Sequence, residues 1–311
     1  MHGMKRIGLI VGFLAVLVLS SAAFAAEAEE EDKGLPLPLH TIEGVGGRPI
    51  TPTAYLVNPP ADGECFGMPA VSAGYVMVGE KDLQNVGLTW NLGQRLELGY
   101  AVNRLGIDDL DSEVRDELGV DFRPNRIYLH HFNARYQLIK ENEWDIPAMP
   151  AITAGAHGKY NNDIDKINRD LGDAMEAFAD YQSERGVDFT LTASKTIDAG
   201  GLPIIVSLGG RLSKASQFGL LGFGDKYMGS FEGNIATFVT DNIVVGAEYR
   251  GKPDVMERVP DLLAEDDAWW DVHAAYVLSP NSVLYAVAGD AGAVANHTDE
   301  MFYGMVFKYD F

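Results

Sequence analysis

From residue 70 to the C-terminus, apolar and polar side chains alternate with a period of two, and this pattern constrains the fold most. At the end of the chain every second residue from Met301 to Phe311 is large and apolar, whereas Lys308 and Asp310 fall between them. Successive side chains of a strand point to opposite faces, so the pattern predicts a strand with one continuous apolar face. The same alternation recurs in several segments: 95–103, 128–138, 187–194 and 270–278.

About twelve such strands are predicted, and the lengths of their connections favour a barrel that crosses a membrane. The expected strands are 70–79, 85–93, 95–103, 126–139, 148–159, 186–197, 203–214, 226–239, 242–250, 268–278, 282–290 and 300–311. Most are near the 9 to 11 residues that a tilted strand needs to cross a bilayer. Long links such as 104–125 alternate with short ones such as 279–281, and only the first link of the long set, 80–84, is short. Outer-membrane barrels combine long external loops with short periplasmic turns.

The two faces of the strands differ in chemistry as a membrane barrel requires. Aromatic residues stand near the ends of the apolar face, which is typical of girdles at the two membrane interfaces; they are Trp90, Tyr128, Tyr136, Tyr249, Trp270, Tyr303 and Phe311. We predict an all-β, antiparallel, up-and-down transmembrane β-barrel with long external loops. Spacings of three and four residues between apolar positions in 161–183 predict one or two short helices in a loop. A soluble exported sandwich, which would also alternate, remains an alternative.

The chain before the barrel divides into three parts. Residues 1–25 combine Lys5 and Arg6 with an uncharged apolar run, 7–19, and a small-residue cleavage site, which predicts a cleaved signal peptide. Residues 26–34 form an acidic, disordered leader. Residues 35–69 are rich in Gly and Pro but too apolar for a free linker, so they predict either a plug in the barrel mouth or a periplasmic segment. Cys65, the single cysteine, is expected to be an unpaired, semi-buried thiol.

With these features the sequence resembles bacterial outer-membrane β-barrel proteins over residues 70–311. The resemblance implies an outer-membrane location in a Gram-negative bacterium, with membrane lipid and lipopolysaccharide as surroundings. It also implies that the terminal aromatic strand is the signal for the barrel-insertion machinery, carried by Tyr303, Phe307, Tyr309 and Phe311. The motifs 37–44 and 50–59 are similar to the opening of a proteobacterial family known only as a domain of unknown function, which implies no activity.

On the polar face, charges of both signs and several histidines are expected to line the lumen. They are Arg95, Glu97, His131, Arg135, His157, Asp188, Arg211, Glu232, Glu248, Arg250, Asp271 and His273. The overall net charge of −21 argues against a nucleic-acid partner. Loops 104–125, 160–185 and 251–267 each hold four more acidic than basic residues, which predicts an acidic external rim. Such a rim favours cations, and groups such as Asp108, Asp109 and Asp111 offer oxygen ligands for divalent cations.

The first functional hypothesis is a passive channel or transport protein for small solutes, with a rim that favours cations. The alternative is a structural or surface-interaction barrel with a filled lumen. A lipid-modifying enzyme is a minor third alternative, because His130 on the apolar face has only Tyr128 and Phe132 as same-face neighbours. No motif assigns a catalytic residue, a metal site or a cofactor.

Overall fold

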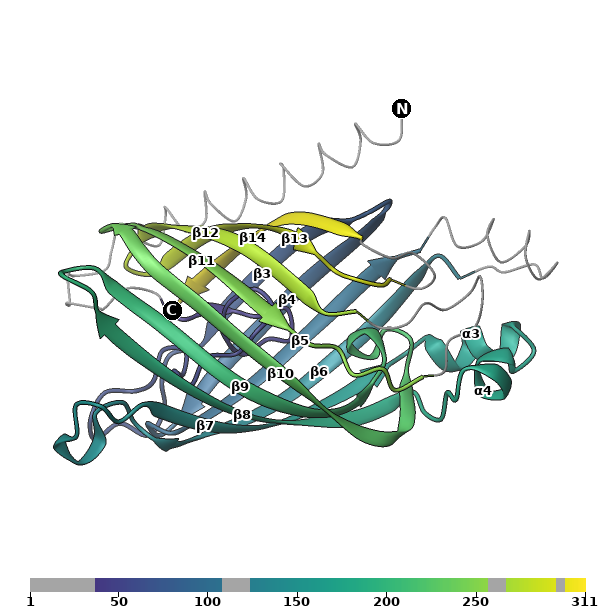
Figure 1. Cartoon of the computed structure of the whole chain (residues 1–311), viewed down its shortest axis with the longest axis horizontal. Helices are drawn as coiled ribbons and strands as arrows, with labels where there is room; N and C mark the ends of the chain where they lie inside the picture. Colours follow the sequence, from purple (N-terminus) through teal and green to yellow (C-terminus); the bar gives the residue numbers. More distant parts are fainter. Residues whose placement is uncertain (1–36, 108–123, 257–266, 295–299) are drawn as a thin grey trace.

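The computed structural model describes residues 37–107, 124–256, 267–294 and 300–311, and their main element is a closed β-barrel. Its twelve antiparallel strands follow one another around the barrel in chain order, and β14 pairs with β3 to close it (Figure 1). The strands are β3 (Ala70–Val78), β4 (Lys81–Leu92), β5 (Leu96–Gly106), β6 (Arg126–Ile139), β7 (Ala151–Asn161), β8 (Arg185–Asp198), β9 (Pro203–Ala215), β10 (Phe223–Thr240), β11 (Ile243–Arg250), β12 (Trp269–Ser279), β13 (Ser282–Asp290) and β14 (Met301–Asp310). The predicted all-β, twelve-stranded barrel is confirmed.

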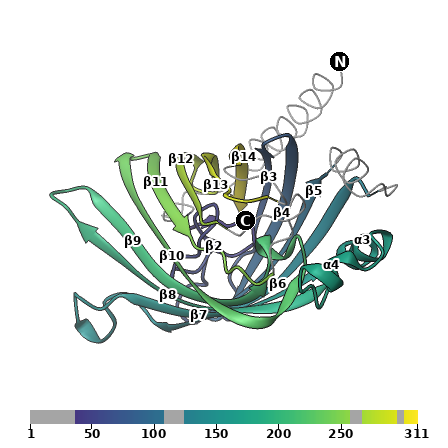
Figure 2. The ribbon, with the colours of Figure 1, turned by 45° about the vertical axis from the view of Figure 1, so that its right-hand side comes forward.

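The remaining elements are short. Two-residue strands β1 (Leu39–His40) and β2 (Gly46–Gly47) pair with each other inside the ring of barrel strands (Figure 2). Single turns of 3-10 helix, η2 (Glu143–Asp145) and η3 (Gln217–Gly219), lie in connections. Helices α3 (Ile164–Asp170) and α4 (Ala174–Phe178) lie at the end of the barrel where the long connections are, which we call the long-loop end. In the part of the chain described, no helix is both long and apolar enough to cross a membrane.

Strand β6 shows why the barrel has an apolar outside. Its inward residues include His131, Asn133 and Arg135, which are buried, whereas Phe132 and Tyr136 point outward and are 57% and 49% exposed. The other strands repeat this arrangement, with Trp90, Leu191 and Trp270 also exposed on the outer face. A soluble protein rarely exposes so large an apolar surface. Closure of the sheet also pairs every edge, so the barrel can lie in lipid without unsatisfied backbone groups.

The largest difference from the expected strand boundaries is at the start of β4. Strand β4 begins at Lys81 rather than at residue 85, because Gly79 and Glu80 alone make the turn and Lys81 pairs with Val78. Gly79 has a φ of +54°, which suits a two-residue hairpin turn. The apolar spacing in 161–183 gives two helices, because the chain passes through left-handed conformations at Gly172 and Asp173 between them.

The outward-facing surface makes a first prediction. Leu191 lies midway along β8 and Val239 lies at the short-turn end of β10, and both point outward. Replacing Leu191 with arginine places a charge near the bilayer midplane and should lower the free energy of unfolding by about 2–4 kcal/mol, whereas Val239→Arg should cost about 0–1 kcal/mol. Denaturant unfolding in lipid vesicles measures both. Equal costs at the two positions would contradict a transmembrane placement of the strands.

Candidate functional site

The inner wall of the barrel holds nearly all of the residues predicted to line a lumen. Eleven of the twelve are buried on inward faces of the strands: Glu97, His131, Arg135, His157, Asp188, Arg211, Glu232, Glu248, Arg250, Asp271 and His273. Arg95 lies instead in the short turn before β5, where its guanidinium is partly exposed and pairs with Glu143 at 2.5 Å. The interior is therefore a charged surface, as the alternation of the sequence indicates.

Residues 37–57, which we call the inner segment, fill this charged interior. Nearly all of them are buried, although β1 and β2 are their only regular elements. A segment with so little secondary structure has many backbone groups that need partners away from water. Carboxylates of the wall accept several of its N–H groups: Glu97 accepts from Gly46 and Val57 at 3.1 and 2.8 Å, and Glu248 accepts from Ile50 and Thr51 at 3.0 and 2.7 Å.

The carbonyl groups of the inner segment are bound by basic and amide side chains of the wall. Arg135 donates to the carbonyl oxygens of Thr53 and Tyr55 at 2.6 and 3.1 Å, and the same guanidinium pairs with Glu97 at 2.8 Å. Amide groups of the wall also donate to backbone carbonyl oxygens of the segment: Asn85 to that of Ile42, Asn133 to that of Glu43 and Gln137 to that of Ala54. The wall thus satisfies both donors and acceptors of the segment's backbone.

Glu43 is the centre of an ion-pair cluster between the inner segment and the wall. Its carboxylate contacts Lys159 at 2.7 Å, Arg211 at 3.0 Å and Arg250 at 2.9 Å. The cluster is completed by Asp188, which pairs with Lys159 and Arg211, and by Glu232, which pairs with Arg211. Three basic and three acidic groups therefore meet in a buried place, and removing one partner there leaves an uncompensated charge.

At the other end of the barrel, the end with the short turns, Tyr55 fixes the exit of the inner segment. Its hydroxyl donates to Oε2 of Glu141 at 2.7 Å, in the turn that follows β6. Burial raises the pKa of the Glu141 carboxyl. Hydrogen bonds from Tyr55 and Thr196 and the nearby charge of Lys195 lower this pKa by a larger amount, so it lies below its usual value. Glu141 is thus ionised at neutral pH and is a strong acceptor for Tyr55.

Apolar packing closes the long-loop end of the interior. Ile42 and Ile50 of the inner segment belong to one apolar cluster with wall residues, with α3 and with the loops beyond the strands. Its larger members include Val76, Leu83, Ile164, Ile167, Phe218, Met256, Trp269 and Phe302. An enclosed cavity beside Ile42, Ile50 and Trp269 has a volume of about 20 Å³, which is room for about one water molecule. The described interior is therefore packed rather than open at this end.

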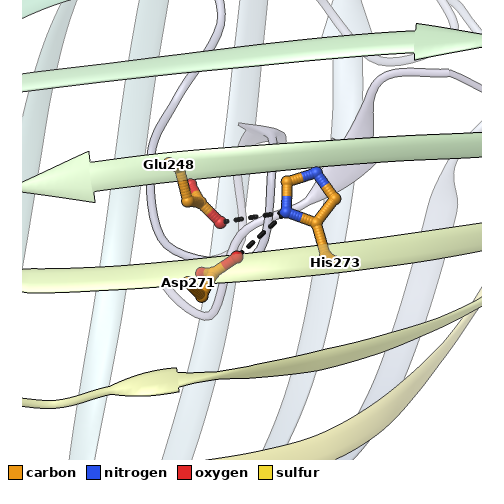
Figure 3. Close-up of side chains that lie close together, drawn as sticks. All are labelled: Glu248, Asp271 and His273. Carbon is orange, nitrogen blue, oxygen red and sulfur yellow. Dashed lines mark hydrogen bonds and ion pairs between the residues drawn. The ribbon is translucent and has the colours of Figure 1, made fainter.

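Three of the predicted wall residues form a separate group on β11 and β12. Glu248 and Asp271 are direct partners across the two strands, and His273 follows on the same face of β12. Nδ1 of His273 lies 2.9 Å from Oδ1 of Asp271 and 3.8 Å from Oε1 of Glu248 (Figure 3). The three side chains have the donor types and the spacing of a metal-binding group.

Sequence patterns did not identify the residues of the inner segment that contact the wall. Glu43, His40 and Arg48 are all buried, and His40 bonds Ser72 and Thr89 at 3.0 and 2.9 Å. Their one signal is the presence of charged and titratable residues within a Gly- and Pro-rich apolar stretch. The expectation of a semi-buried Cys65 is wrong, because this thiol is exposed in a turn outside the packed interior.

Other expected residues have different surroundings. Tyr303 and Phe311 of the terminal strand region are exposed, Tyr309 contacts Phe311 edge to face, and Phe307 is buried. The predicted cation ligands Asp108, Asp109 and Asp111 lie outside the described residues, as do the signal peptide and the acidic leader.

An apolar outer surface, a charged inner wall and a closed twelve-stranded sheet define an outer-membrane β-barrel with a segment of its own chain inside. The chain belongs to the family described as "Protein of unknown function (DUF3034)", whose model matches residues 38–304. No curated protein matches the chain.

Solved structures with a similar fold include proteins of different activities. The KdgM porin is 11% identical, with a TM-score of 0.47 over 78% of this chain and 99% of that chain. The Acinetobacter baumannii outer membrane protein Omp33 is 12% identical, with a TM-score of 0.44 over 79% and 99%. The Salmonella typhi outer membrane phospholipase is 10% identical, with a TM-score of 0.38 over 81% and 94%.

The Glu43 cluster makes a second prediction. Glu43→Gln removes one negative charge from a buried group of three basic and two remaining acidic side chains, a change that costs about 3–5 kcal/mol. Release of the inner segment into water relieves this cost, so we expect the segment to leave the interior more often. A cysteine introduced at the buried Ala54, in a Cys65→Ser background, should react with a maleimide at least about a hundredfold faster in the Glu43→Gln variant than with Glu43 intact.

The matched control is Glu64→Gln, which makes the same change in an exposed turn and should leave the labelling rate unchanged. If Glu43→Gln also leaves the rate unchanged, the ion-pair cluster does not hold the inner segment in place.

Proposed function

We propose that the protein is an outer-membrane channel for small polar solutes that its own inner segment closes in the state described. The observation that carries this proposal is the polarity of the wall. Wall residues bind the inner segment through charged groups, such as those of Glu97, Arg135 and Glu248. Water can replace each of these hydrogen bonds when the segment moves, and the exchange costs about 1.5–3 kcal/mol net for each bond to a charged group rather than the full strength of the bond.

An apolar wall would behave differently. If the interior were lined with packed aliphatic side chains, loss of the inner segment would expose them to water at about 25 cal/mol per Å². In this barrel the middle of the interior is ionic. Apolar surface would be exposed only at the long-loop end and at a smaller apolar cluster of Leu39, Val283, Tyr285 and Val306. The charged wall is therefore suited to two states, one filled by the segment and one filled by water.

Solute preference is the finer part of the proposal. The wall carries basic and acidic side chains in similar number, so it sets no strong preference by sign. Long acidic loops would raise the local concentration of cations at the entrance. We propose a weak cation preference, with export through a cleaved signal peptide at residues 1–25 and insertion directed by the terminal strand that ends at Phe311.

A barrel with a permanently filled lumen, which acts in structure or in surface interaction, is the second candidate. The apolar cluster at the long-loop end favours it, because Ile42, Ile50 and Trp269 would have to separate before solutes could enter. A lipid-modifying role has less support. His130, on the outer face, contacts the Tyr100 hydroxyl and the Asn162 amide, and neither group is a nucleophile of the kind that lipid hydrolysis uses.

Single-channel recording tests whether the protein is a channel, with a reversible disulfide that holds the inner segment against the wall. The backbone nitrogen of Ala54 lies 2.7 Å from Oγ of Ser194, so we choose Ala54→Cys with Ser194→Cys, in a Cys65→Ser background, as the pair to cross-link, and mass spectrometry verifies the disulfide. We expect no current steps from the oxidised protein in planar bilayers and discrete steps after reduction. Reversal potentials in a salt gradient then report the preference for cations.

Two results would contradict the proposal. Identical current from the oxidised and reduced proteins would mean that the inner segment does not gate the lumen. Absence of current from the reduced protein, together with current from a folded variant that lacks residues 37–57, would favour the permanently filled barrel. The single variant Ala54→Cys, treated with the same oxidant, controls for effects of oxidation alone.

A further inference from the structure

Two buried carboxylates of the wall lack the basic partner that all the others have. Among the described residues, eight carboxylates are buried: Glu43, Asp82, Glu97, Asp188, Glu232, Glu248, Asp271 and Asp310. Six of them form an ion pair with a lysine or an arginine. Glu248 and Asp271 have only His273 as an ion-pair partner, and their carboxyl groups also hydrogen-bond to each other. Two buried carboxylates in contact repel each other when both are ionised, so a cation bound between them would stabilise this place in the wall.

The donor atoms already have the spacing of a metal site. Oδ1 of Asp271, Oε1 of Glu248 and Nδ1 of His273 converge in Figure 3, with the histidine nitrogen 2.9 and 3.8 Å from the two oxygens. Ligands of a tetrahedral Zn²⁺ ion, at about 2.0–2.1 Å from the metal, are roughly 3.3 Å from one another. The two distances lie on either side of that value, so small side-chain adjustments would complete three ligand positions.

Unpartnered polar atoms give an independent indication of a missing ligand. Oδ2 of Asp271 and Nε2 of His273 are buried and have no hydrogen-bond partner among the described residues. Buried polar atoms of native proteins are nearly always satisfied by protein, water or an ion. A bound ion with its own water would supply a partner for the free carboxylate oxygen.

The orientation of Glu248 is fixed by the inner segment. Its Oε1 accepts from the N–H of Ile50, and its Oε2 accepts from the N–H and the hydroxyl of Thr51. Such hydrogen bonds to a ligating carboxylate are the usual support that orients it toward a metal. Arg48 is close enough to interact electrostatically with Glu248 and His273, but it forms no direct ion pair with either of them.

We propose that Glu248, Asp271 and His273 bind one transition-metal dication of the Zn²⁺ class. One imidazole nitrogen with two carboxylates suits Zn²⁺, Fe²⁺ or Co²⁺, whereas Ca²⁺ takes six to eight oxygen ligands and Mg²⁺ retains its waters. The ion supplies the positive charge that Lys and Arg supply to the other buried carboxylates. Since Glu248 also binds Ile50 and Thr51, the bound ion strengthens the contact between wall and inner segment.

Metal retention by the folded full-length protein tests the site. Wild type in detergent micelles, incubated with Zn²⁺ and then passed over a desalting column with a weak chelator, should retain about one ion per chain by mass spectrometry. Asp271→Asn and His273→Gln should retain at least tenfold less. His157→Gln is the matched control, because His157 is equally buried but bonds Asn133 and Thr190 in another part of the wall, and it should retain zinc as wild type does.

Folding of each variant is checked by the shift in gel mobility between heated and unheated samples. Because a variant may fail this check, a second measurement uses wild type alone: bound Co²⁺ should give the intense visible absorption of a four-coordinate site. Equal zinc retention by Asp271→Asn, His273→Gln and His157→Gln, no retention by wild type, or the weak spectrum of six-coordinate Co²⁺ would each overturn the proposal.

Discussion

Pairing of buried charges between the wall and the inner segment is the interaction on which the rest of the structure depends. A barrel in lipid must place its apolar residues outside, so the period-two pattern leaves Arg135, Arg211 and Glu248 pointing inward. Some of these groups pair with their neighbours in the wall, as Arg135 does with Glu97 and Arg211 with Asp188. The inner segment supplies further partners: a carboxylate for the basic groups and backbone N–H groups for Glu248.

The interior is consequently asymmetric. Basic groups from β7, β9 and β11 converge on Glu43, while Glu97 and Arg135 hold the segment from β5 and β6. On β11 and β12 the acidic pair has only hydrogen-bond donors and a histidine as neighbours within contact distance. The same short segment therefore makes direct ion pairs on one side of the wall, and on the other side it offers backbone N–H groups and the more distant charge of Arg48. The proposed metal ion and the proposed closure of the channel both follow from this difference.

Local pattern was sufficient to predict the barrel but not its contents. Alternation from Met301 to Phe311 reports which face of a strand is apolar, and connection lengths report how strands follow one another, so fold and strand count were accessible. Contacts of Glu43 with Lys159, Arg211 and Arg250 join residues more than a hundred positions apart, and no periodicity encodes such a pairing. The apolar spacing in 161–183 predicted one or two short helices, and the position of the break between α3 and α4 depends on backbone conformation at Gly172 rather than on apolar spacing.

Closure of the sheet between β3 and β14 imposes an order on assembly. Because the inner segment precedes β3 in the chain, it is synthesised before any wall strand, yet its partners Glu248 and Arg250 lie on the ninth of the twelve wall strands. Its final contacts cannot form until β11 is in place, and after the first and last strands pair it can no longer enter from the side. The segment must therefore be enclosed as the sheet curls around it or be drawn in through an open end of the finished cylinder.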